Sequence, residues 1–503
     1  MEGRLAAGVT KSISRLERES ASMEVMLDQY VFRRDGGAKR FPGNNTTAMA
    51  HTCIGVPFSV CVDLAPAPAI SRFYLQWPGG PKPEAGRFCQ IVAAHRGLLL
   101  LRFTSLFKSK TSPQDLQCAD DYFVYTPVVS FGKPSLAHLP AWLSEKDREF
   151  YLRRQRERKE ENIWKSRRTS SLFAEEDTPE VRRAEALTRE RHEEQLALGV
   201  DVDQDIEPSS LIAENLGLVC SEDGDRFIVA ELHRLYKTAM DQSGVYLAEL
   251  SMFRSSDDGG PSSSWELKQL PVDYHPGLHC FEPQAVVPFD SCLCWVNYRR
   301  GMILAHDVLE HKSPKLSYVA LPRSFTRSHL LEYERMHRGV CATDGGRLLK
   351  LVDVVSNNQQ CLYEISFAIV TYTLTKTKDG CMEWARDAAT PMTDKELWGL
   401  KAPAPVPHEV PMLPLVSMDK PHIIHFLLSE LTDNIDTLTL VTVDMDDRTV
   451  LSVRPYIKGE QELCGEDADL ARARSSFLEP FLPAEFPWFR YFLYTYIHLC
   501  QFY

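Results

Sequence analysis

The feature that most constrains the fold is a recurring unit of short apolar strands joined by tight turns, which fills the chain from residue 214 onward. LGLVCSEDGDRFIVAEL, GVCATDGGRLLKLVDVV and TLTLVTVDMDDRTVLSV each read as a strand, an acidic turn and a second strand. Turns of this kind join antiparallel neighbours. The sequence therefore predicts a mainly β protein built from antiparallel hairpins.

The hairpins group into longer units with a loose internal period. FIVAEL, VYLAELSMF and WELKQLPV form one unit, and CLCWVNY, GMILAHDV and KLSYVALP form the next. Their third strands end alike, because WELKQLP and LSYVALP both finish in Leu-Pro. Repeats of about 40 to 60 residues, each with three or four antiparallel strands, are typical of propeller blades. We therefore expect a propeller-like array of five or six short antiparallel blades.

Composition shifts divide the chain into five parts. Residues 1–55 are predicted to be a poorly ordered N-terminal arm, and residues 56–143 to form N-terminal β blades from runs such as RFYLQW and DYFVYTPVV. Residues 144–210 are predicted to be a charged insertion, helical or disordered. Residues 211–485 carry the C-terminal β blades, and 486–503 form an aromatic tail.

The insertion is dense in mixed charge, as in SEKDREFYLRRQRERKEENIWKSRRTSS. Its apolar stripe is too thin for a buried helix, which favours an exposed helix or a disordered segment. The run RRQRERK at 153–159 is compatible with a nuclear import signal, although a solvated charged face explains it better. Ser170 and Ser171 follow two arginines, a short pattern for basophilic kinases that is common by chance.

Charge and cysteine usage narrow the class of protein. The chain has 57 basic and 69 acidic residues, a net charge of −12, which predicts no nucleic-acid partner. Its 13 cysteines form no matched CxxC pairs, so we expect reduced, mostly buried thiols in an intracellular protein. The first residues lack the apolar core of a secretory signal. These features predict a cytoplasmic or nuclear protein that is not secreted.

The tail FPWFRYFLYTYIHLCQFY, residues 486–503, is overwhelmingly aromatic and aliphatic. It is long enough for a membrane anchor, but Arg490, His498 and Gln501 interrupt it. Its tyrosines and β-branched residues favour a strand over a membrane helix. A divergent tail with no settled role is the third alternative.

Several stretches together carry a family resemblance. The stretches that resemble segments of a large plant family abundant in grasses, the domain of unknown function 1618, include CLCWVNYRRGMILAHDVLEHKSPKLSYVALP, ISRFYLQWPGGP, TDGGRLLKLVDV and PLVSMDKPHIIHFLL. The resemblance covers roughly 56–485 apart from the insertion, with its most distinctive part at about 284–425. A fainter similarity links the chain to the β-repeat domains that follow F-boxes, although residues 1–55 lack an F-box pattern. The resemblance implies no catalytic residues, cofactor or chemical activity.

The stretch at 292–308 holds the most reactive residue types. Cys292 and Cys294 lie two apart, so on a strand they share one face, and no further zinc ligands are evident. His306 and Asp307 are adjacent and therefore point to opposite faces, which excludes a dyad between them. We expect Asp307 to bond backbone amides at a strand end.

Trp295 and Tyr298 are predicted to be packing residues at a blade surface. Arg299 and Arg300 flank Gly301, which can supply a positive-φ turn residue.

Other candidate sites are weaker. His422 and His425 lie three apart and face opposite sides of a strand, which disfavours a metal site. Asp444, Asp446 and Asp447 are expected to form a turn. No motif for a nucleophile elbow, a phosphate loop, a zinc protease or a dinucleotide site occurs. We therefore predict no catalytic, cofactor-binding or metal-binding residues.

Two functional hypotheses remain. The first is a non-catalytic scaffold on a β-propeller-like body that binds an unidentified protein partner, with the charged insertion as a regulated arm. The second is a hydrolase- or lyase-type enzyme with its site in the axial channel, because propellers support both binding and catalysis. Convergent His, Asp or Glu side chains with strongly perturbed pKa values in a deep axial pocket would favour the enzyme.

Overall fold

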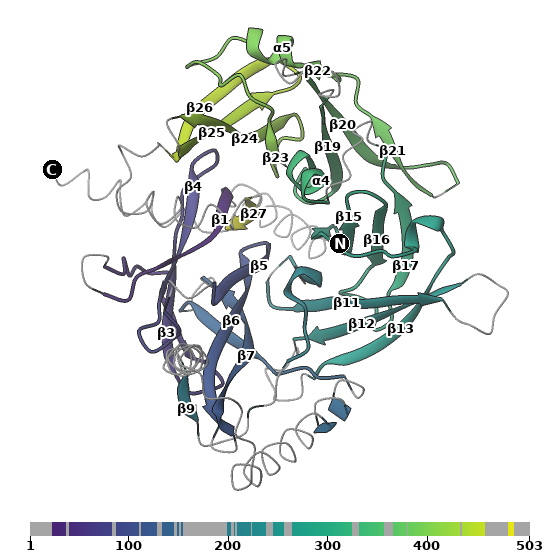
Figure 1. Ribbon diagram of the computed structural model, residues 1–503. Helices are drawn as coiled ribbons and strands as arrows, with labels where there is room; N and C mark the ends of the chain where they lie inside the picture. The colour runs from purple at the N-terminus through teal and green to yellow at the C-terminus, as the bar shows by residue number, and fades with distance from the viewer. Residues whose placement is uncertain are drawn as a thin grey trace, which may run out of the picture.

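The structure is a ring of six small β-sheets arranged as the blades of a β-propeller (Figure 1). It is a computed structural model, and the residues that it describes are 23–36, 40–82, 87–109, 112–127, 133–144, 148–149, 152–153, 199–202, 206, 209–222, 224–237, 245–255, 264–323, 331–356, 366–379, 381–432, 435–457 and 481–486. The predicted mainly β, propeller-like fold is confirmed, and the ring has six blades.

Each blade is numbered here in the order in which the chain builds its sheet, and its strands are given from the axis outward. Blade 1 consists of β27 (Leu482–Phe486), β1 (Met23–Arg33), β4 (Ile70–Gln76), β3 (Pro57–Asp63) and β2 (Ala48–His51). Blade 2 consists of β5 (Cys89–His95), β6 (Leu98–Ser109), β7 (Ser112–Thr126) and β8 (Ser135–Leu139), with β9 (Val200–Val202) parallel to β6. Blade 3 consists of β10 (Leu216–Cys220), β11 (Phe227–Lys237), β12 (Tyr246–Arg254) and β13 (Glu266–Val272).

The remaining blades follow the same plan. Blade 4 consists of β14 (Ala285–Phe289), β15 (Cys292–Asn297), β16 (Gly301–His306) and β17 (Lys315–Ala320). Blade 5 consists of β18 (Arg338–Thr343), β19 (Leu348–Ser356), β20 (Phe367–Lys376) and β21 (Met382–Arg386), with β22 (Met392–Thr393) also on β20. Blade 6 consists of β23 (Met412–Val416), β24 (Ile423–Thr432), β25 (Ile435–Asp444) and β26 (Thr449–Ile457). Short helices lie between strands: η2 (Ala213–Asn215), η3 (Pro276–Leu278), α4 (Leu331–His337) and α5 (Asp394–Gly399).

Burial differs between inner and outer strands in the way that a propeller requires. Most of the inner strand β14 is half-buried, but every residue of the inner strands β10 and β23 is buried, because each of these two lies between two neighbouring blades. Both faces are therefore covered, and the sequences LGLVC and MLPLV are apolar almost throughout. The outer strand β13 has alternating exposure at its C-terminal end, which suits a strand with one solvated face.

Blade 1 is assembled from both ends of the described chain. In Figure 1 the yellow β27 lies beside the purple β1 near the centre of the ring. The two strands are antiparallel, with Met23 opposite Phe486 and Leu27 opposite Leu482, whereas β1 runs parallel to β4. This differs from the prediction of a poorly ordered arm over residues 1–55. The strand partners of β1 are far away in sequence, and Asp28 and Gln29 interrupt its apolar pattern, so no local signal marks it as a strand.

Two carboxylates, of the half-buried Glu24 and the buried Asp28, connect blade 1 to blade 6 across the closure seam. The Glu24 carboxylate accepts a hydrogen bond from the Ser417 hydroxyl and another from the Met418 N–H, each at 2.7 Å. The Asp28 carboxylate accepts from the Tyr456 hydroxyl at 2.8 Å. Burial raises the pKa of Glu24, and it raises the pKa of Asp28 to about 6 although the hydrogen bond from the Tyr30 N–H opposes this rise.

The two ends of the predicted charged insertion lie next to each other beside blade 2. The Ser210 N–H donates to the Trp142 carbonyl at 2.7 Å, so the chain is fastened on both sides of the excursion. Most of residues 144–210, including Ser170, Ser171 and residues 154–159, lie outside the described part of the chain, as do residues 487–503 of the aromatic tail. Among the residues that are described, no helix has the length and apolarity needed to span a membrane.

Candidate functional site

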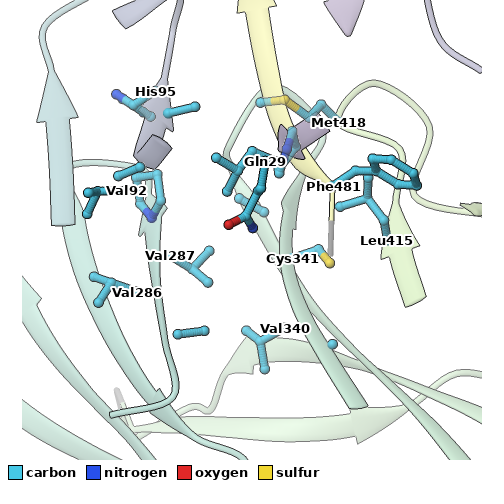
Figure 2. Close-up of a pocket in the computed structure, with 18 of the residues that line it drawn as sticks. Gln29, Val92, His95, Val286, Val287, Val340, Cys341, Leu415, Met418 and Phe481 are labelled. Atoms are coloured by element: carbon cyan, nitrogen blue, oxygen red, sulfur yellow. The ribbon is translucent and has the colours of Figure 1, made fainter. Parts of the chain in front are cut away.

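A cavity of about 190 Å³ lies on the axis of the ring, where the inner strands of all six blades meet. Most of its wall is aliphatic. Figure 2 shows Val92, Val286 and Val287 on one side of the cavity and Leu415 and Phe481 on the other. Because each blade contributes mainly its inner strand and the residues next to it, the lining residues come from segments spread over the whole chain.

The end of the cavity at which the inner strands begin is polar. Gln90 comes from the start of β5, Glu214 from η2 just before β10, Gln284 from the residue before β14, and Arg335 from α4 just before β18. Gln29 of β1 adds a fifth polar side chain, and its amide is directed into the cavity (Figure 2). The site therefore combines an aliphatic shaft with amide, carboxylate and guanidinium groups at this end. Arg96 and Glu485 also line the cavity, near His95 at the other end.

Arg338 also lines the cavity, but its guanidinium is committed to the walls. It donates hydrogen bonds to the carbonyls of Tyr298 and of Pro322, the latter at 2.8 Å. Its Nε lies 3.4 Å from a carboxylate oxygen of Asp353, and both side chains are 3% exposed. That contact is an ion pair without hydrogen-bond geometry, because Nε has no hydrogen-bond partner among the described residues. Arg338 thus ties blade 5 to blade 4.

The opposite end of the cavity contains His95, whose ring is used structurally. Its Nδ1 accepts a hydrogen bond from the Cys220 N–H at 3.0 Å, which assigns the proton of the neutral ring to Nε2. Burial, together with the charge of the nearby Arg96, lowers the pKa of His95 to about 3. His95 is therefore neutral at physiological pH, and its Nδ1 lone pair is occupied. This bond joins the end of β5 to the end of β10.

The ionisable Cys and Tyr side chains of the cavity are held in their neutral forms. Burial raises the pKa of Cys341 to about 11, even though a hydrogen bond from the backbone of Val416 opposes this rise. Burial also raises the pKa of Tyr298 to about 12. A nucleophilic cysteine needs a lowered pKa, and the environment of Cys341 acts in the opposite direction.

The stretch at 292–308 forms β15, a turn and β16 in blade 4, as the sequence predicted. Cys292 and Cys294 share one apolar cluster, and burial raises the pKa of both thiols. Trp295 is fully buried rather than at a blade surface, and its indole N–H donates to the Asn215 carbonyl at 2.8 Å. Tyr298 is also buried, at 5% exposure.

His306 and Asp307 make separate contacts. The Nε2 of His306 lies 2.6 Å from the Ser317 hydroxyl on the neighbouring strand β17. Asp307 accepts a hydrogen bond from the Ser291 hydroxyl at 2.7 Å. The predicted separation of the two side chains is correct, but the partner of the Asp307 carboxylate is a hydroxyl rather than a backbone amide.

The turn after β15 uses Arg299, Arg300 and Gly301 differently from the prediction. Arg299 forms an ion pair with Glu334 of α4 at 2.9 Å. Gly301 is not in the positive-φ region. Glycine is needed there because a Cβ would lie 2.6 Å from the Val319 carbonyl oxygen and would also meet the Tyr318 hydroxyl. Close approach of β17, not backbone conformation, explains this glycine.

The histidines and aspartates of blade 6 are structural. The Nδ1 of His425 lies 2.9 Å from the Thr442 hydroxyl, whereas His422 lies 3.8 Å from Asp444. Asp444 accepts from the N–H groups of Asp446 and Asp447, each at 3.0 Å, which forms the predicted turn. Among the described residues, no three His, Cys, Asp or Glu side chains converge as a metal site would require.

The sequence analysis nominated none of the polar groups that line the cavity. Gln29, His95, Arg335 and Arg338 belong to four different segments, and no local motif connects them. The only available signal is their position, because Arg335 and Arg338 directly precede the apolar inner strand GVCAT, and His95 ends the strand CQIVAAH. If the inner strand of each blade had been identified in the sequence, these residues would have been predicted to lie on the axis.

Part of the chain matches a known protein family. Residues 295–425 match the model of a protein of unknown function (DUF1618). No curated protein matches the chain. The matched segment runs from Trp295 in β15 to His425 in β24, and so spans parts of blades 4, 5 and 6. The plant origin and the fainter similarity to F-box-associated domains stay predictions. Over this segment the chain is similar to the DUF1618 family of proteins of unknown function, the family whose resemblance the sequence analysis noted.

Proposed function

We propose that the protein is a non-catalytic interaction scaffold, in which the propeller is a rigid body and the charged insertion of residues 144–210 is the arm that engages a protein partner. The observation that carries this proposal is the fastened base of the insertion. Ser210 and Trp142 are hydrogen-bonded, and Trp142 lies against Trp265 of blade 3, with ring centroids 6.2 Å apart. The Trp265 indole N–H donates to the Pro140 carbonyl at 2.7 Å.

The contacts at the two ends of the insertion support the proposal, because they make the fold of the ring independent of the residues within the arm. Blades 2 and 3 are joined at Trp142 and Trp265 whatever the chain does between residues 144 and 208. An excursion of mixed charge that is not needed to join the blades is available for recognition. Its charge pattern suits a protein surface of mixed charge, and the net charge of −12 disfavours nucleic acid.

The state of the axial groups favours binding over catalysis. The hydrolase or lyase alternative needs a base or nucleophile whose reactive atom is free and whose pKa suits proton transfer near neutral pH. In the cavity, the Nδ1 of His95 is occupied, the thiol of Cys341 is disfavoured as a thiolate, and Arg338 is committed to backbone carbonyls. These assignments favour a scaffold. The cavity group that an enzyme could still use as an acid or base is Glu485, because burial raises the pKa of its carboxyl group.

We also propose that the protein works inside the cell, in the cytoplasm or nucleus. The cysteines within the described residues are all free thiols, including the buried Cys61, Cys220 and Cys294. Free thiols are the usual state in a reducing compartment. A membrane role and a nucleic-acid partner are not part of the proposal.

The test is affinity purification with mass spectrometry from cells of the source organism. The full chain is compared with a variant in which residues 154–198 are replaced by a Gly/Ser linker of equal length, which retains β9 and the Trp142–Ser210 base. A partner that is reproducibly retained by the full chain and lost by the variant would support the arm as its binding element. Failure of the full chain to retain any partner, with both proteins showing the same cooperative unfolding, would contradict the scaffold proposal.

A further inference from the structure

We propose that the axial cavity binds a small carboxylate with a compact apolar body, whose carboxylate is held by Arg335 at the polar end. This inference goes beyond the scaffold function, because it concerns a small ligand inside the ring rather than a protein on its surface. It rests on three features that coincide in the cavity: its size, its aliphatic walls and the guanidinium at one end.

The size and the walls define the body of the ligand. An apolar protein cavity of about 150 Å³ accommodates a benzene ring. The axial cavity, at about 190 Å³, therefore has room for one ring or a branched chain with one further group. Val92, Val286, Val287, Val340 and Leu415 surround it (Figure 2). Such walls offer no hydrogen bonds to a cluster of waters, so an apolar ligand gains by replacing water there.

The charge at the polar end defines the head of the ligand. Arg335 is half-buried on α4, and within the described residues no carboxylate lies within ion-pair distance of it. Arg338, three residues further along, has Asp353 as its partner, and Arg96 at the other end of the cavity has the carboxyl group of Glu485 nearby. Glu214 lines the same end from blade 3, with blade 4 between it and the α4 helix. A single carboxylate is therefore drawn to the Arg335 side of the opening, where a guanidinium can bind it with two parallel hydrogen bonds.

Gln29 adds a hydrogen-bonding group inside the cavity. Its side chain is 9% exposed, it belongs to the closure strand β1, and its amide is directed into the cavity (Figure 2). An amide can donate to a carboxylate oxygen or to another polar substituent of the ligand. An inorganic anion bound here would leave the aliphatic part of the cavity unfilled. A plain hydrocarbon would leave Arg335 without a ligand group to bind.

The test measures binding of two acids and their neutral analogues by isothermal titration calorimetry and ligand-observed NMR at pH 7. The probes are phenylacetate and 3-methylbutanoate, with phenylacetamide and 3-methylbutanamide as the matched neutral compounds. Ligands of about ten non-hydrogen atoms are expected to bind with a Kd near or below about 1 mM. We expect each acid to bind at least about tenfold more tightly than its amide. No binding of either acid, or equal binding of acid and amide, would overturn the proposal.

Variants then locate the bound acid. Arg335→Gln is expected to weaken binding of the acids at least about tenfold and to leave the amides unchanged. Arg347→Gln is the matched control, because it removes the same charge from the exposed turn between β18 and β19, where Arg347 pairs with Asp344. Equal weakening by the two variants would mean that diffuse charge, not Arg335, attracts the acid, and the assignment would be wrong.

A cavity-filling variant tests the apolar part of the site. Val287→Phe places a ring in the cavity and is expected to abolish binding of both acids while the far-ultraviolet circular dichroism stays unchanged. If Val287→Phe does not fold, Ala285→Leu narrows the cavity from the same strand with a smaller change. Undiminished binding by a folded filling variant would place the acid elsewhere and overturn the proposal.

Discussion

Blade 4 and blade 1 contain similar strands but are assembled from the sequence in opposite ways. Blade 4 is one continuous run from Ala285 to Ala320, in which each strand pairs with the next. Blade 1 takes three strands from residues 48–76, a fourth from Met23–Arg33 and its innermost strand from Leu482–Phe486. The comparison shows that a blade can keep the same architecture while its stabilising contacts change from local to long-range.

The seams of the two blades differ as well. Blade 4 contacts blade 5 through apolar packing, the Arg338 guanidinium and the ion pair of Arg299 with Glu334. Blade 1 contacts blade 6 through the half-buried carboxylate of Glu24 and the buried carboxylate of Asp28. Of these two seams, the one that joins the two ends of the chain therefore contains carboxyl groups with a raised pKa.

The largest expected effect comes from phenylalanines that end the inner strands of the two blades. Phe486 ends β27 and is 1% exposed, and Phe289 ends β14 and is 8% exposed. Each Phe→Ala change is expected to lower the free energy of unfolding by about 3–5 kcal/mol. Chemical denaturation measures this loss.

Hydrogen exchange separates the two variants. Phe486→Ala is expected to speed exchange of the β1 amides selectively, because β27 is the partner of β1 on the axial side. Phe289→Ala is expected to leave β1 protected to the level of global unfolding. Equal β1 exchange in the two variants would show that the closure strand does not open separately from the ring.

The next effect is the pH dependence of the closure seam. Burial raises the pKa of Asp28 to about 6 in the folded protein, above its ordinary value of 3.8. The stability that this group contributes is therefore fully present below about pH 4 and is lost as the pH rises through about 6. Asp28→Asn is expected to raise the free energy of unfolding by about 2–3 kcal/mol at pH 7.5 and to leave it nearly unchanged at pH 4.

Asp387 of blade 5 is the matched control, because its contribution to stability is expected to change with pH in the opposite direction to that of Asp28. Burial acts to raise its pKa, but hydrogen bonds from Thr371, Thr373 and Lys350 outweigh burial, and the net pKa is lowered. The stability contributed by Asp387 is therefore present at neutral pH and lost as the pH falls through its lowered pKa. Asp387→Asn is expected to destabilise the protein at pH 7. Chemical denaturation between pH 4 and 7.5 measures both variants, and the same sign for both would refute the contrast between the seam and the blade.

A smaller effect tests how closely inner strands approach. Gly339 in β18 lies against the backbone of Pro414 in β23, and a Cβ at Gly339 would meet the Pro414 carbonyl oxygen. Gly339→Ala is expected to cost about 1–3 kcal/mol, because neither strand can move without disturbing its blade. Gly399→Ala, at the end of α5 with open space around it, is expected to be neutral or slightly stabilising. Thermal unfolding compares the two, and an equally mild effect at Gly339 would mean that the blades can shift apart.

The smallest effect is expected at the exposed ion pair between blades 4 and 5. The Arg299 side chain is 39% exposed, and Glu334 lies 2.9 Å from it. Solvent screening limits such pairs, so Arg299→Gln is expected to cost less than about 1 kcal/mol. Denaturation at low and high salt measures this cost. A loss as large as that from Phe289→Ala would show that the pair, rather than apolar packing, holds this seam.

Blade 4 also shows how much of the fold can be predicted from sequence. β15, β16 and β17 were readable because their apolar runs, turn and Leu-Pro ending are consecutive. β14 was missed because AVVPF is short and contains proline, and β1 was missed because its partners are β4 and β27. Strand pairing across hundreds of residues leaves no local pattern.

The candidate site was less predictable than the fold. The types of residue that draw attention in a sequence, such as Cys292 and His306, belong to blade packing. The groups that meet on the axis, such as Gln29 and Arg335, are ordinary in their local context. These groups converge because they lie at or near the starts of inner strands. To predict the site from sequence, one would need to know the blade boundaries and which strand closes the ring.

The composite blade also has a consequence for synthesis of the chain. About 450 residues separate β1 from β27, and at about 5–20 residues per second β1 emerges some 20–90 seconds before its last partner. During that time one edge of β1 has unpaired backbone groups, which are a template for pairing with another chain. Glu24 and Asp28 then face water as charged groups on that edge and resist such pairing. The carboxylates that cost stability in the finished ring therefore protect the nascent chain from aggregation.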